Sequence, residues 1–522
     1  MSTFYLYLGF SETVGKVNCY IFSIQIYLMV KQEFEKKVSQ LVNLSNVGEL
    51  LGWDQEVMMP EGGIKARSEQ MSTVAMLRHN ILVNNELKDI LDALEKEDLS
   101  EKEKVDYREL KWEYERFKDV PESLVREISS LQAESVEAWR EAKEDNDFEK
   151  FAPKLERMVE LKRKLAEHID PEAEPYEVLY RDYEPHIDLE HMDNILDRLA
   201  EELPVLLQNI KENGSEVETE ALDTEVSEEN QMELSRDLVT KLGYNWDRGR
   251  LDTSTHPFTS GTQFDARITT RFDKDDLDES LSASIHECGH ALYQQGLPDD
   301  HYGSFLGESR EIGFHESQSR LYENHVGKSE EFWNFMLPKL REQTGKFDGV
   351  TPEECYRFMS RVKQDNLIRV KADELTYHLH IIVRFEIERK LVNGDIEVRD
   401  LPEIWNEKYR EYLGLNPETD SEGVLQDIHW AWGNFGYFPT YSLGSVTSAQ
   451  IFHKLEQEVE VNTAMEQGEF QEIREWLREN IHSEGRKHPT DQFIKEITGE
   501  ELTADYFLEY IKEKYSELYD LE

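Results

Sequence analysis

Apolar side chains recur every three or four positions from residue 31 to about 170, as in FEKKVSQLVNLSNVGELLGW and LERMVELKRKLAEHI. This period is typical of amphipathic helices that bury one face in a core. Pro60, which two glycines follow, predicts a break in the first long helix and the start of a second one. A further helical block is predicted at 175–212, before an acidic loop at 214–230 with a frayed helix start.

Strand-like sequence is rare in this chain. The best case is QFDARITTRF at 263–272, where alternation and β-branched residues predict one or two short strands. The chain has no βαβ rhythm, no repeat of fixed period and no Pro/Gly-rich linker. The pattern therefore predicts a mostly α fold, with a single large helical domain and a small short-stranded β element.

The first 28 residues differ from the rest of the chain. The apolar run YIFSIQIYLMV at 20–30 is too short to span a bilayer, and KQEFEKK follows it where a signal peptide would have small residues. We expect residues 1–28 to be an N-terminal extension outside the fold, with Met29 as the biological start and 29–522 as the helical domain. An ordered extra helix or strand at 1–28 is the alternative.

Composition and charge limit the partners. With 38% hydrophobic and 32% charged residues, the chain of 522 residues is predicted to be a soluble globular protein. Asp and Glu number 110 against 59 Lys and Arg, and the net charge of −51 would repel nucleic acid and anionic membranes. We expect no partner of either kind, and such acidity raises the hypothesis of a salt-rich cytoplasm. Three cysteines are too few for a disulfide framework and fit a reducing cytoplasm.

The motif HECGH places His286 and His290 four positions apart, just after the predicted strands. On a helix the two rings project from one face and can bind one ion, whereas Glu287 lies about 100° further round the axis. Zn²⁺ held by neutral imidazoles lowers the pKa of its water towards ~7. A glutamate beside it can take the proton as the water attacks a peptide carbonyl. The motif predicts a zinc-dependent peptide hydrolase with Glu287 as general base.

Two helix-surface histidines beside an ordinary acid are the alternative interpretation of this motif. The small and apolar residues on both sides, SASI and ALY, favour a buried helix instead. Gly289 costs that helix about 1 kcal/mol relative to Ala, which is tolerable where another element must come close. Cys288 faces away from the side that the two histidines share and is interpreted as a packing residue.

A catalytic zinc site needs a third protein ligand. The downstream segment FLGESREIGFHESQSRLYEN offers four candidates, Glu308, Glu311, His315 and Glu316. Periodicity places Glu316 in the first turn of a new helix, from which its carboxylate could face the HECGH helix. Spacing alone does not choose among the four.

The chain resembles the carboxypeptidase Taq family of metallocarboxypeptidases. Six ordered segments carry the resemblance: HPF at 256, DARIT at 265, HECGH at 286, HESQSR at 315, IRVKAD at 368 and GVLQDIHW at 423. The segments LLGWDQEVMMPEGG and GYFPTYSLG are also similar to that family. The resemblance implies an almost all-α fold with a deep active-site cleft, a homodimer, and release of single C-terminal residues with broad specificity. It also implies Glu316 as the third metal ligand.

A carboxypeptidase must recognise a free carboxylate, for which a planar guanidinium is the best partner. Arg369 in IRVKAD is the first candidate and Arg267 in DARIT the second. The alternative for each is a structural ion pair, with Asp373 and Asp265 respectively.

Peptide hydrolysis also builds an oxyanion that hydrogen-bond donors stabilise. His429 and Tyr437 resemble the histidine and tyrosine that serve this purpose in related helical metallopeptidases of the angiotensin-converting-enzyme type, and Tyr441 is the reserve. Core packing is the alternative for both tyrosines.

Three further residues are predicted to bind or enclose the substrate. His256 precedes a proline in an extended segment and is expected to contact the substrate backbone or to shape the cleft rim. Gln426 and Asp427 are expected to line the closed end of the cleft. The strand DARITTR is expected to bind the peptide by edge pairing, which tolerates many sequences.

The leading hypothesis is therefore a cytoplasmic zinc carboxypeptidase of peptide turnover, with cobalt as another ion that imidazole and carboxylate ligands accept. An oligopeptidase that cuts internal bonds of short peptides is the alternative within the same chemistry. A helical scaffold or chaperone without catalysis is a third hypothesis. Glu287 argues against that one, because a purely structural zinc site would not need it.

Overall fold

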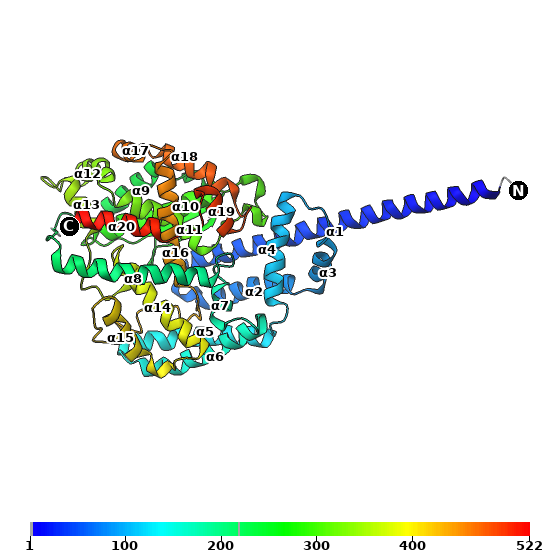
Figure 1. Cartoon of the computed structure of the whole chain (residues 1–522), viewed down its shortest axis with the longest axis horizontal. Helices are drawn as coiled ribbons and strands as arrows, with labels where there is room; N and C mark the ends of the chain where they lie inside the picture. Colours follow the sequence, from blue (N-terminus) through cyan, green and yellow to red (C-terminus); the bar gives the residue numbers. More distant parts are fainter. Residues whose placement is uncertain (1–3, 218–219, 522) are drawn as a thin grey trace. The chain divides into compact units, whose positions relative to one another are not determined.

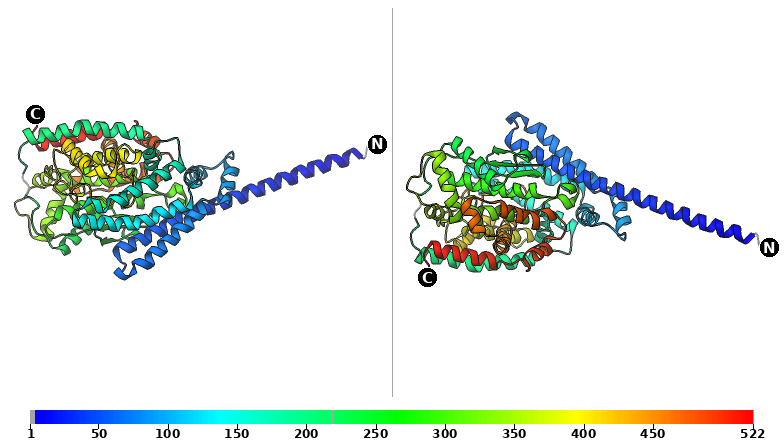
Figure 2. Two further views of the ribbon diagram at one scale, coloured as in Figure 1. Left: turned by 90° about the horizontal axis from the view of Figure 1, so that it is seen from below. Right: turned by 90° about the horizontal axis from the view of Figure 1, so that it is seen from above.

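The computed structural model describes residues 4–217 and 220–521, without the side chains of 4–24 and 26. Contacts within the chain divide it into two compact units, whose helices are labelled in Figure 1 and seen from two further sides in Figure 2. Unit 1 comprises Met1–Lys118 and Asp300–Glu308, and unit 2 comprises Asp119–Asp299 and Ser309–Glu522. Each unit has its own hydrophobic core.

Unit 1 is built from four helices: α1 (Phe4–Val57), α2 (Ile64–Leu82), α3 (Asn85–Leu94) and α4 (Glu101–Phe117). The predicted break occurs at Pro60, and a single helical turn at Glu61–Gly63 leads into α2. Ser100 begins α4 with a capping box, because its hydroxyl accepts from the backbone of Glu103 while the Glu103 carboxylate accepts from the backbone of Ser100. The expectation for residues 1–28 falls mostly on side chains that the structure does not describe, and it stays a prediction.

Unit 2 holds the remaining helices and all the strands of the described residues. Its helices are α5 (Glu122–Asp145), α6 (Ala152–Ile169), α7 (Pro175–Tyr180), α8 (Leu189–Asn213), α9 (Glu228–Leu242), α10 (Leu277–Gly296), α11 (Ile312–Arg320), α12 (Glu330–Thr344), α13 (Pro352–Ser360), α14 (Thr376–Asn393), α15 (Leu401–Tyr412), α16 (Pro439–Glu456), α17 (Val461–Gln467), α18 (Gln471–Asn480), α19 (Thr490–Thr498) and α20 (Asp505–Leu518).

Two of these helices, α14 and α16, are apolar or buried on nearly every side and form the centre of unit 2. The long helices α8 and α20 lie side by side at its outside, as Figures 1 and 2 both show. The mostly α fold class predicted from the sequence is confirmed. Among the described residues, no helix is long and apolar enough to cross a membrane.

The β element is a three-stranded sheet in the order β1-β3-β2, made of β1 (Leu251–Thr253), β2 (Thr259–Thr262) and β3 (Asp265–Thr270). Strand β3 pairs in parallel with β1 and antiparallel with β2, with Ile268 opposite both Leu251 and Thr259. The small sheet expected ahead of the HECGH helix is confirmed. The expectation that DARITTR binds peptide through its edge is wrong, because β3 is the central strand and both of its edges are already paired.

Candidate active site

Helix α10 carries His286 and His290 one turn apart, with ring centroids 4.9 Å apart. Both side chains are only partly exposed, while Glu287 and Cys288 between them are buried. Asp276 caps the start of the helix by accepting a hydrogen bond from the backbone of Glu279. Burial raises the pKa of the Cys288 thiol, which keeps this thiol protonated and inert as a packing group.

Glu316 on α11 faces both histidines. Its Oε2 atom lies 3.6 Å from Nε2 of His286 and 3.4 Å from Nε2 of His290, and the three ligand atoms lie within 4.8 Å of one another. A tetrahedral zinc ion with ligands at about 2.1 Å separates its ligand atoms by about 3.4 Å. The donor set and the spacing therefore fit a divalent cation, and these three residues could hold one.

The other three candidates for a third ligand do not belong to this group. Glu311 pairs with His186 at 2.6 Å and accepts a hydrogen bond from Thr490. His315 contacts His290 through its Nδ1 atom, at 2.6 Å, on the side away from Glu316. Glu308 lies before α11 begins.

Two glycines allow α11 to pass close to its neighbours. A Cβ atom at Gly289 of α10 would lie 2.7 Å from the backbone of Gln318 and of Ser319. On the other side of α11, a Cβ atom at Gly444 of α16 would lie 2.4 Å from Cγ of Glu316. Both distances are shorter than van der Waals contact. The position of Glu316 therefore depends on glycine at both of these places.

Glu323 and Arg320 surround the ligands with further contacts. The Nδ1 atom of His286 lies 2.8 Å from Oε2 of Glu323, which leaves Nε2 to face Glu316. Arg320 donates through Nε to Glu316 at 2.7 Å and through Nη1 to Glu323 at 3.1 Å. Glu323 lies in a π-helical turn, Leu321–Gly327, that continues α11. Neither residue was predicted from the sequence, because an ordinary helical period does not indicate the turn that brings Glu323 to His286.

The buried carboxylates of the site control the protonation of His286. Burial lowers the pKa of His286, but the carboxylates of Glu316 and Glu323 outweigh burial and raise it to about 10. Although burial opposes it, the contacts with Arg320 and His286 hold the pKa of Glu316 well below its usual range. Without a metal the site therefore keeps a proton on His286, and a divalent cation would replace that proton.

Glu287 points towards the small sheet. The hydroxyl of Thr259 in β2 lies 2.6 Å from Oε2 of Glu287 and 2.9 Å from its backbone oxygen. This contact orients the carboxylate of the expected general base. It was not predicted, because Thr259 is 28 positions away along the chain.

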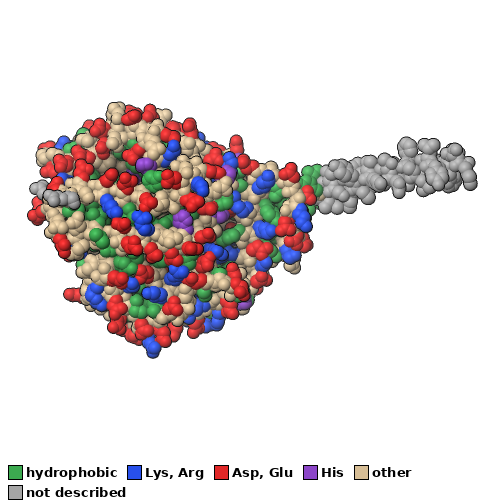
Figure 3. Space-filling model, viewed as in Figure 1, with side chains coloured by type: hydrophobic (Ala, Val, Ile, Leu, Met, Phe, Trp, Pro, Cys, Tyr) green, Lys and Arg blue, Asp and Glu red, His purple; other side chains and the backbone are tan. Residues whose placement is uncertain are grey.

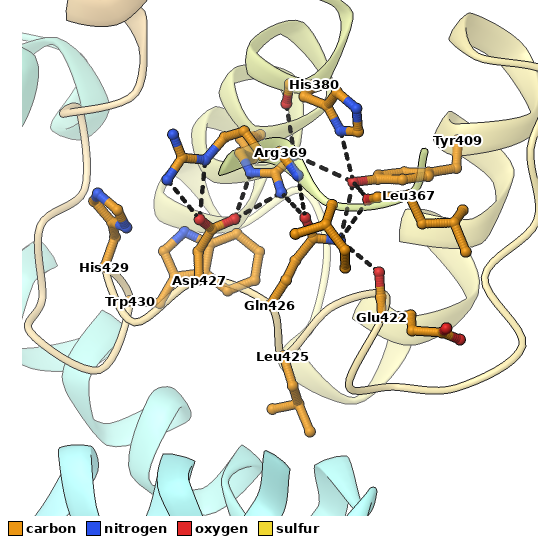
Figure 4. A network of polar contacts seen from close by, with 12 residues as sticks. Leu367, Arg369, His380, Tyr409, Glu422, Leu425, Gln426, Asp427, His429 and Trp430 are labelled. Carbon is orange, nitrogen blue, oxygen red and sulfur yellow. Dashed lines mark hydrogen bonds and ion pairs between the residues drawn. The ribbon is translucent and has the colours of Figure 1, made fainter. Parts of the chain in front are cut away.

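Arg369 lies in a buried polar network that Figure 4 shows in close-up. Its guanidinium contacts Oδ1 of Asp427 through Nε at 3.0 Å and Nη2 at 2.9 Å, and it donates from Nη1 to the Tyr377 hydroxyl at 3.1 Å. Arg384 of α14 contacts the other oxygen of Asp427 at 2.6 Å. The alternative partner expected from the sequence, Asp373, instead accepts from the backbone of Leu375 and Thr376.

Gln426 is held within the same network. Its Oε1 atom accepts from the backbone of Arg369 at 3.0 Å and from Arg384 at 2.8 Å. Its Nε2 atom donates to the backbone oxygens of Leu367 and Glu422 and to the Tyr409 hydroxyl (Figure 4). Its amide is thus occupied by protein groups that fix the loop before Asp427.

His429 and the two tyrosines form an aromatic group. The ring of His429 lies 5.4 Å from that of Tyr437, and its Nε2 atom lies 3.4 Å from the Tyr441 hydroxyl. Burial lowers the pKa of His429 to about 4, and it raises the pKa of Tyr437 to about 12. The Glu316 carboxylate contributes to the raised pKa of each tyrosine, so both hydroxyls lie within its electrostatic reach.

The last two predicted substrate residues lie on the sheet and beside it. Arg267 of β3 forms a two-point ion pair with Asp265, at 2.9 and 2.7 Å, which is the structural alternative considered for it. His256 is exposed in the connection between β1 and β2, and its backbone oxygen accepts from Ser254.

An HExxH helix crossed by a second helix that supplies a glutamate, inside an almost entirely helical unit, defines a helical metallopeptidase. The model of the carboxypeptidase Taq (M32) metallopeptidase family matches residues 33–515, and the chain belongs to this family. The protein is therefore a metallocarboxypeptidase. The family expected from the six motifs is confirmed.

Individual relatives agree over nearly the whole chain. Carboxypeptidase 1 of Bacillus subtilis is 37% identical over 495 residues, which are 94% of this chain and 98% of the relative. Thermostable carboxypeptidase 1 of Thermus thermophilus is 37% identical over 503 residues, 93% of this chain and 98% of the relative. The crystal structure of an M32 carboxypeptidase from Deinococcus radiodurans matches with a TM-score of 0.90 and 34% identity, over 94% of this chain and all of that one.

Proposed function

We propose that this metallocarboxypeptidase depends on zinc and releases single C-terminal residues from peptides with broad specificity, with Glu287 as the general base. The observation that carries the proposal is the position of the Glu316 carboxylate, 3.4 and 3.6 Å from the two Nε2 atoms of the HExxH helix. His286, His290 and Glu316 would hold the ion. Two imidazoles and one carboxylate suit catalytic zinc and also accept cobalt.

When bound, the ion supplies Lewis acidity, which lowers the pKa of water and polarises a peptide carbonyl. Glu287 then accepts a proton from the attacking water and returns it to the leaving amine. The Thr259 hydroxyl holds one oxygen of this carboxylate, so the other oxygen is left to face the water. Orientation by a fixed hydrogen bond reduces the reorganisation that the proton transfer requires.

His429 and Tyr437 would stabilise the negative oxygen that forms during the attack. With its pKa at about 4, His429 is neutral near pH 7, and one ring nitrogen carries a proton to donate. Its Nδ1 atom has no hydrogen-bond partner in the part of the chain that the structure describes. Tyr437 keeps its hydroxyl proton for the same use, and Tyr441 could replace it.

Arg369 would bind the C-terminal carboxylate of the substrate. Asp427 is shared by Arg369 and Arg384, so one carboxylate balances two guanidinium groups and one positive charge remains. Arg369 has five N–H groups, of which three contact Asp427 and Tyr377. A peptide carboxylate can take the remaining donors and balance the charge in this buried place.

Broad specificity is supported by the edge position of β2. No described strand pairs with the side of β2 that faces away from β3. An extended peptide that pairs there would be held by its main chain, which is independent of side-chain identity. Strand β2 also carries Thr259, so a peptide bound along it would lie beside Glu287, with His256 just ahead of the strand. Arg267 is the second candidate for carboxylate binding.

We further propose a homodimer in a reducing cytoplasm. The dimer is supported by the resemblance of this chain to the carboxypeptidase Taq family. The compartment is supported by Cys288 and Cys355, which are buried free thiols. Sedimentation equilibrium of the purified protein checks the dimer, and a mass near 61.4 kDa would contradict it.

The test of the proposed function uses N-blocked peptides, zinc-loaded protein and a Glu287→Gln variant, with products identified by mass. Stepwise loss of terminal residues with the parent protein alone is the expected result. A matched peptide with an amidated C-terminus should resist cleavage. Internal fragments from both peptides would favour the endo-acting oligopeptidase, and cleavage that chelation leaves unchanged would overturn the metal-dependent mechanism.

A further inference from the structure

The segment between α15 and α16 carries His429 and Tyr437 without the support of regular structure. It runs from residue 413 to 438, and it contains no helix or strand, although all of it is described. An irregular stretch of this length inside a compact unit must be held by contacts with its neighbours. Backbone bonds from Gly433 to Trp430 at 3.0 Å and from Asn434 to His429 at 2.9 Å close a turn inside the segment. The contacts with neighbouring helices then place this turn and the two side chains beside it.

Helix α5 holds one side of this segment. Gln132 donates to the backbone oxygen of Trp432 at 2.7 Å, Trp139 donates to that of Leu425 at 3.0 Å, and Lys143 donates to that of Gln426 at 2.9 Å. These three bonds go to backbone oxygens, so they fix the path of the chain. They do not set the spacing between His429 and Tyr437, because none of them reaches residues 433–438.

Glu388 of α14 holds the other side at two points. Its Oε1 atom accepts from the indole N–H of Trp430 at 2.8 Å, and its Oε2 atom accepts from the backbone N–H of Gly436 at 3.1 Å. Trp430 is the neighbour of His429 in the chain, and Gly436 is the neighbour of Tyr437. One rigid carboxylate thus joins the two ends of the stretch that bears both side chains.

We propose that Glu388 is a positioning residue of the active site, whose carboxylate sets the spacing between His429 and Tyr437 by binding Trp430 and Gly436. This proposal rests on the roles given to His429 and Tyr437 under the proposed function. Glu388 acts through these neighbours and touches no substrate atom.

The surroundings of Glu388 support a geometric role. Its side chain is fully buried, and its partners are the donors of Trp430, Gly436 and, at 3.3 Å, Tyr176. No direct ion pair to Glu388 is present among the described residues. Burial of a carboxylate without a counter-ion costs free energy of folding and raises the pKa of Glu388, whereas the hydrogen bonds from Gly436, Trp430 and Tyr176 lower it. An apolar residue would avoid that cost but could not join the two donors.

The test compares three variants of the zinc-loaded protein. Glu388→Gln keeps the shape of the side chain but turns one acceptor into a donor that opposes an N–H group. Trp430→Phe leaves Glu388 unchanged and removes the indole bond, together with part of the buried ring that packs against Trp405. Glu386→Gln is the matched control, because Glu386 is on the same helix, pairs with Lys408 at 2.6 Å and accepts from the Tyr412 hydroxyl, and both of these partners belong to α15 and not to 413–438. We expect kcat to fall about tenfold to a hundredfold in the first two variants and to stay at the parent value in the control. KM should change less than twofold, and the zinc content should not change.

A second measurement does not depend on activity. Amide hydrogen exchange of peptides that cover 424–438 should become faster in Glu388→Gln and Trp430→Phe and remain unchanged in Glu386→Gln. In the double variant Glu388→Gln with His429→Ala, the loss in kcat should be smaller than the product of the two single losses, because both changes act partly through His429. A loss equal to that product would show that Glu388 acts elsewhere.

The outcomes separate the two proposals. Parent values of kcat in His429→Ala and Tyr437→Phe would overturn the roles of those side chains, whatever Glu388 does. Parent kcat together with unchanged exchange in Glu388→Gln would overturn the positioning role. If Glu388→Gln does not fold, Trp430→Phe decides, since it leaves the carboxylate in place, and unchanged kcat and exchange there would overturn the proposal.

Discussion

The carboxylate of Glu323 lies 2.8 Å from Nδ1 of His286 and so determines which nitrogen of that ring faces Glu316. Glu323 is itself held by Arg320 at 3.1 Å and by Lys328 at 2.8 Å. An outer carboxylate of this kind fixes the tautomer and the orientation of a metal-binding imidazole and raises its basicity.

Replacement of Glu323 should therefore weaken metal binding. We expect Glu323→Gln to lower the affinity for Zn²⁺ about 10- to 100-fold, measured by competition with a chromogenic chelator. Glu342→Gln, an exposed acid on α12, is the matched control and should keep the parent affinity. Equal affinities of parent and Glu323→Gln would contradict the role of Glu323.

Removal of the metal should make stability depend on pH. The pKa of His286 rises from its ordinary value of 6.5 to about 10 in the metal-free fold. A raised histidine pKa stabilises the fold fully below pH 6.5, and this contribution disappears as the pH rises through 10. The Tm of chelated protein should thus fall between pH 6.5 and 10, by more than in a chelated His286→Gln variant. If calorimetry gave the same dependence of Tm on pH for both chelated proteins, His286 would not be the group responsible.

Loss of the general base should spare the metal. We expect Glu287→Gln to bind Zn²⁺ as the parent does, because Glu287 is not among the three ligand residues. Its kcat should fall more than about 100-fold, in line with the usual contribution of general base catalysis. Thr259→Val, which removes only the hydrogen bond to Glu287, should cause a smaller loss. A Glu287→Gln variant with more than a tenth of the parent kcat would exclude it as the base.

Arg369 should account for the preference of the enzyme for peptides with a free C-terminus over peptides with a blocked one. Arg369→Gln should raise KM about 100-fold for free peptides, since a charge-assisted pair with the carboxylate is lost. Arg389→Gln is a suitable control, because Arg389 lies on α14 and pairs with Glu174 and Asp193. If both variants hydrolyse free peptides with the same KM, carboxylate binding lies elsewhere, with Arg267 as the next candidate.

Salt should stabilise the protein. The net charge of −51 creates self-repulsion, and Figure 3 shows acidic side chains over much of one face, with basic ones among them. Counterions screen repulsion between exposed charges, with a Debye length that falls from about 10 Å at 0.1 M to about 3 Å at 1 M. We expect the Tm to rise between low and molar NaCl, and a flat or falling Tm would contradict the hypothesis of a salt-adapted protein.

Sequence patterns could predict the two histidines of the candidate metal site, because their spacing follows a local rule. The spacing of His286 and His290 determines a shared helix face. Spacing left Glu316 as one of four candidates, and only the resemblance to the carboxypeptidase Taq family selected it. The helix break at Pro60 and the strand at 265–270 were likewise predictable from local residue types. These features depend on residues near one another in the chain.

The supporting contacts were not predictable in the same way. Thr259 reaches Glu287 only because β2 lies against α10, and Arg369 meets Asp427 across 58 positions, where the sequence suggested the nearer Asp373. The π-helical turn that brings Glu323 to His286 has no signature in a 3.6-residue period. The order of the strands in the sheet could not be predicted from the sequence pattern either. The strand that was expected to bind peptide through its edge, β3, is the central strand of the sheet.

Helix α11 passes Gly289 on one side and Gly444 on the other at distances that leave no room for a methyl group. Two residues without a side chain thereby restrict where α11 can lie. A change to alanine at either position would push the Glu316 carboxylate out of line with His286 and His290. Surveys of natural or laboratory variation that follow only the reactive side chains would overlook this constraint.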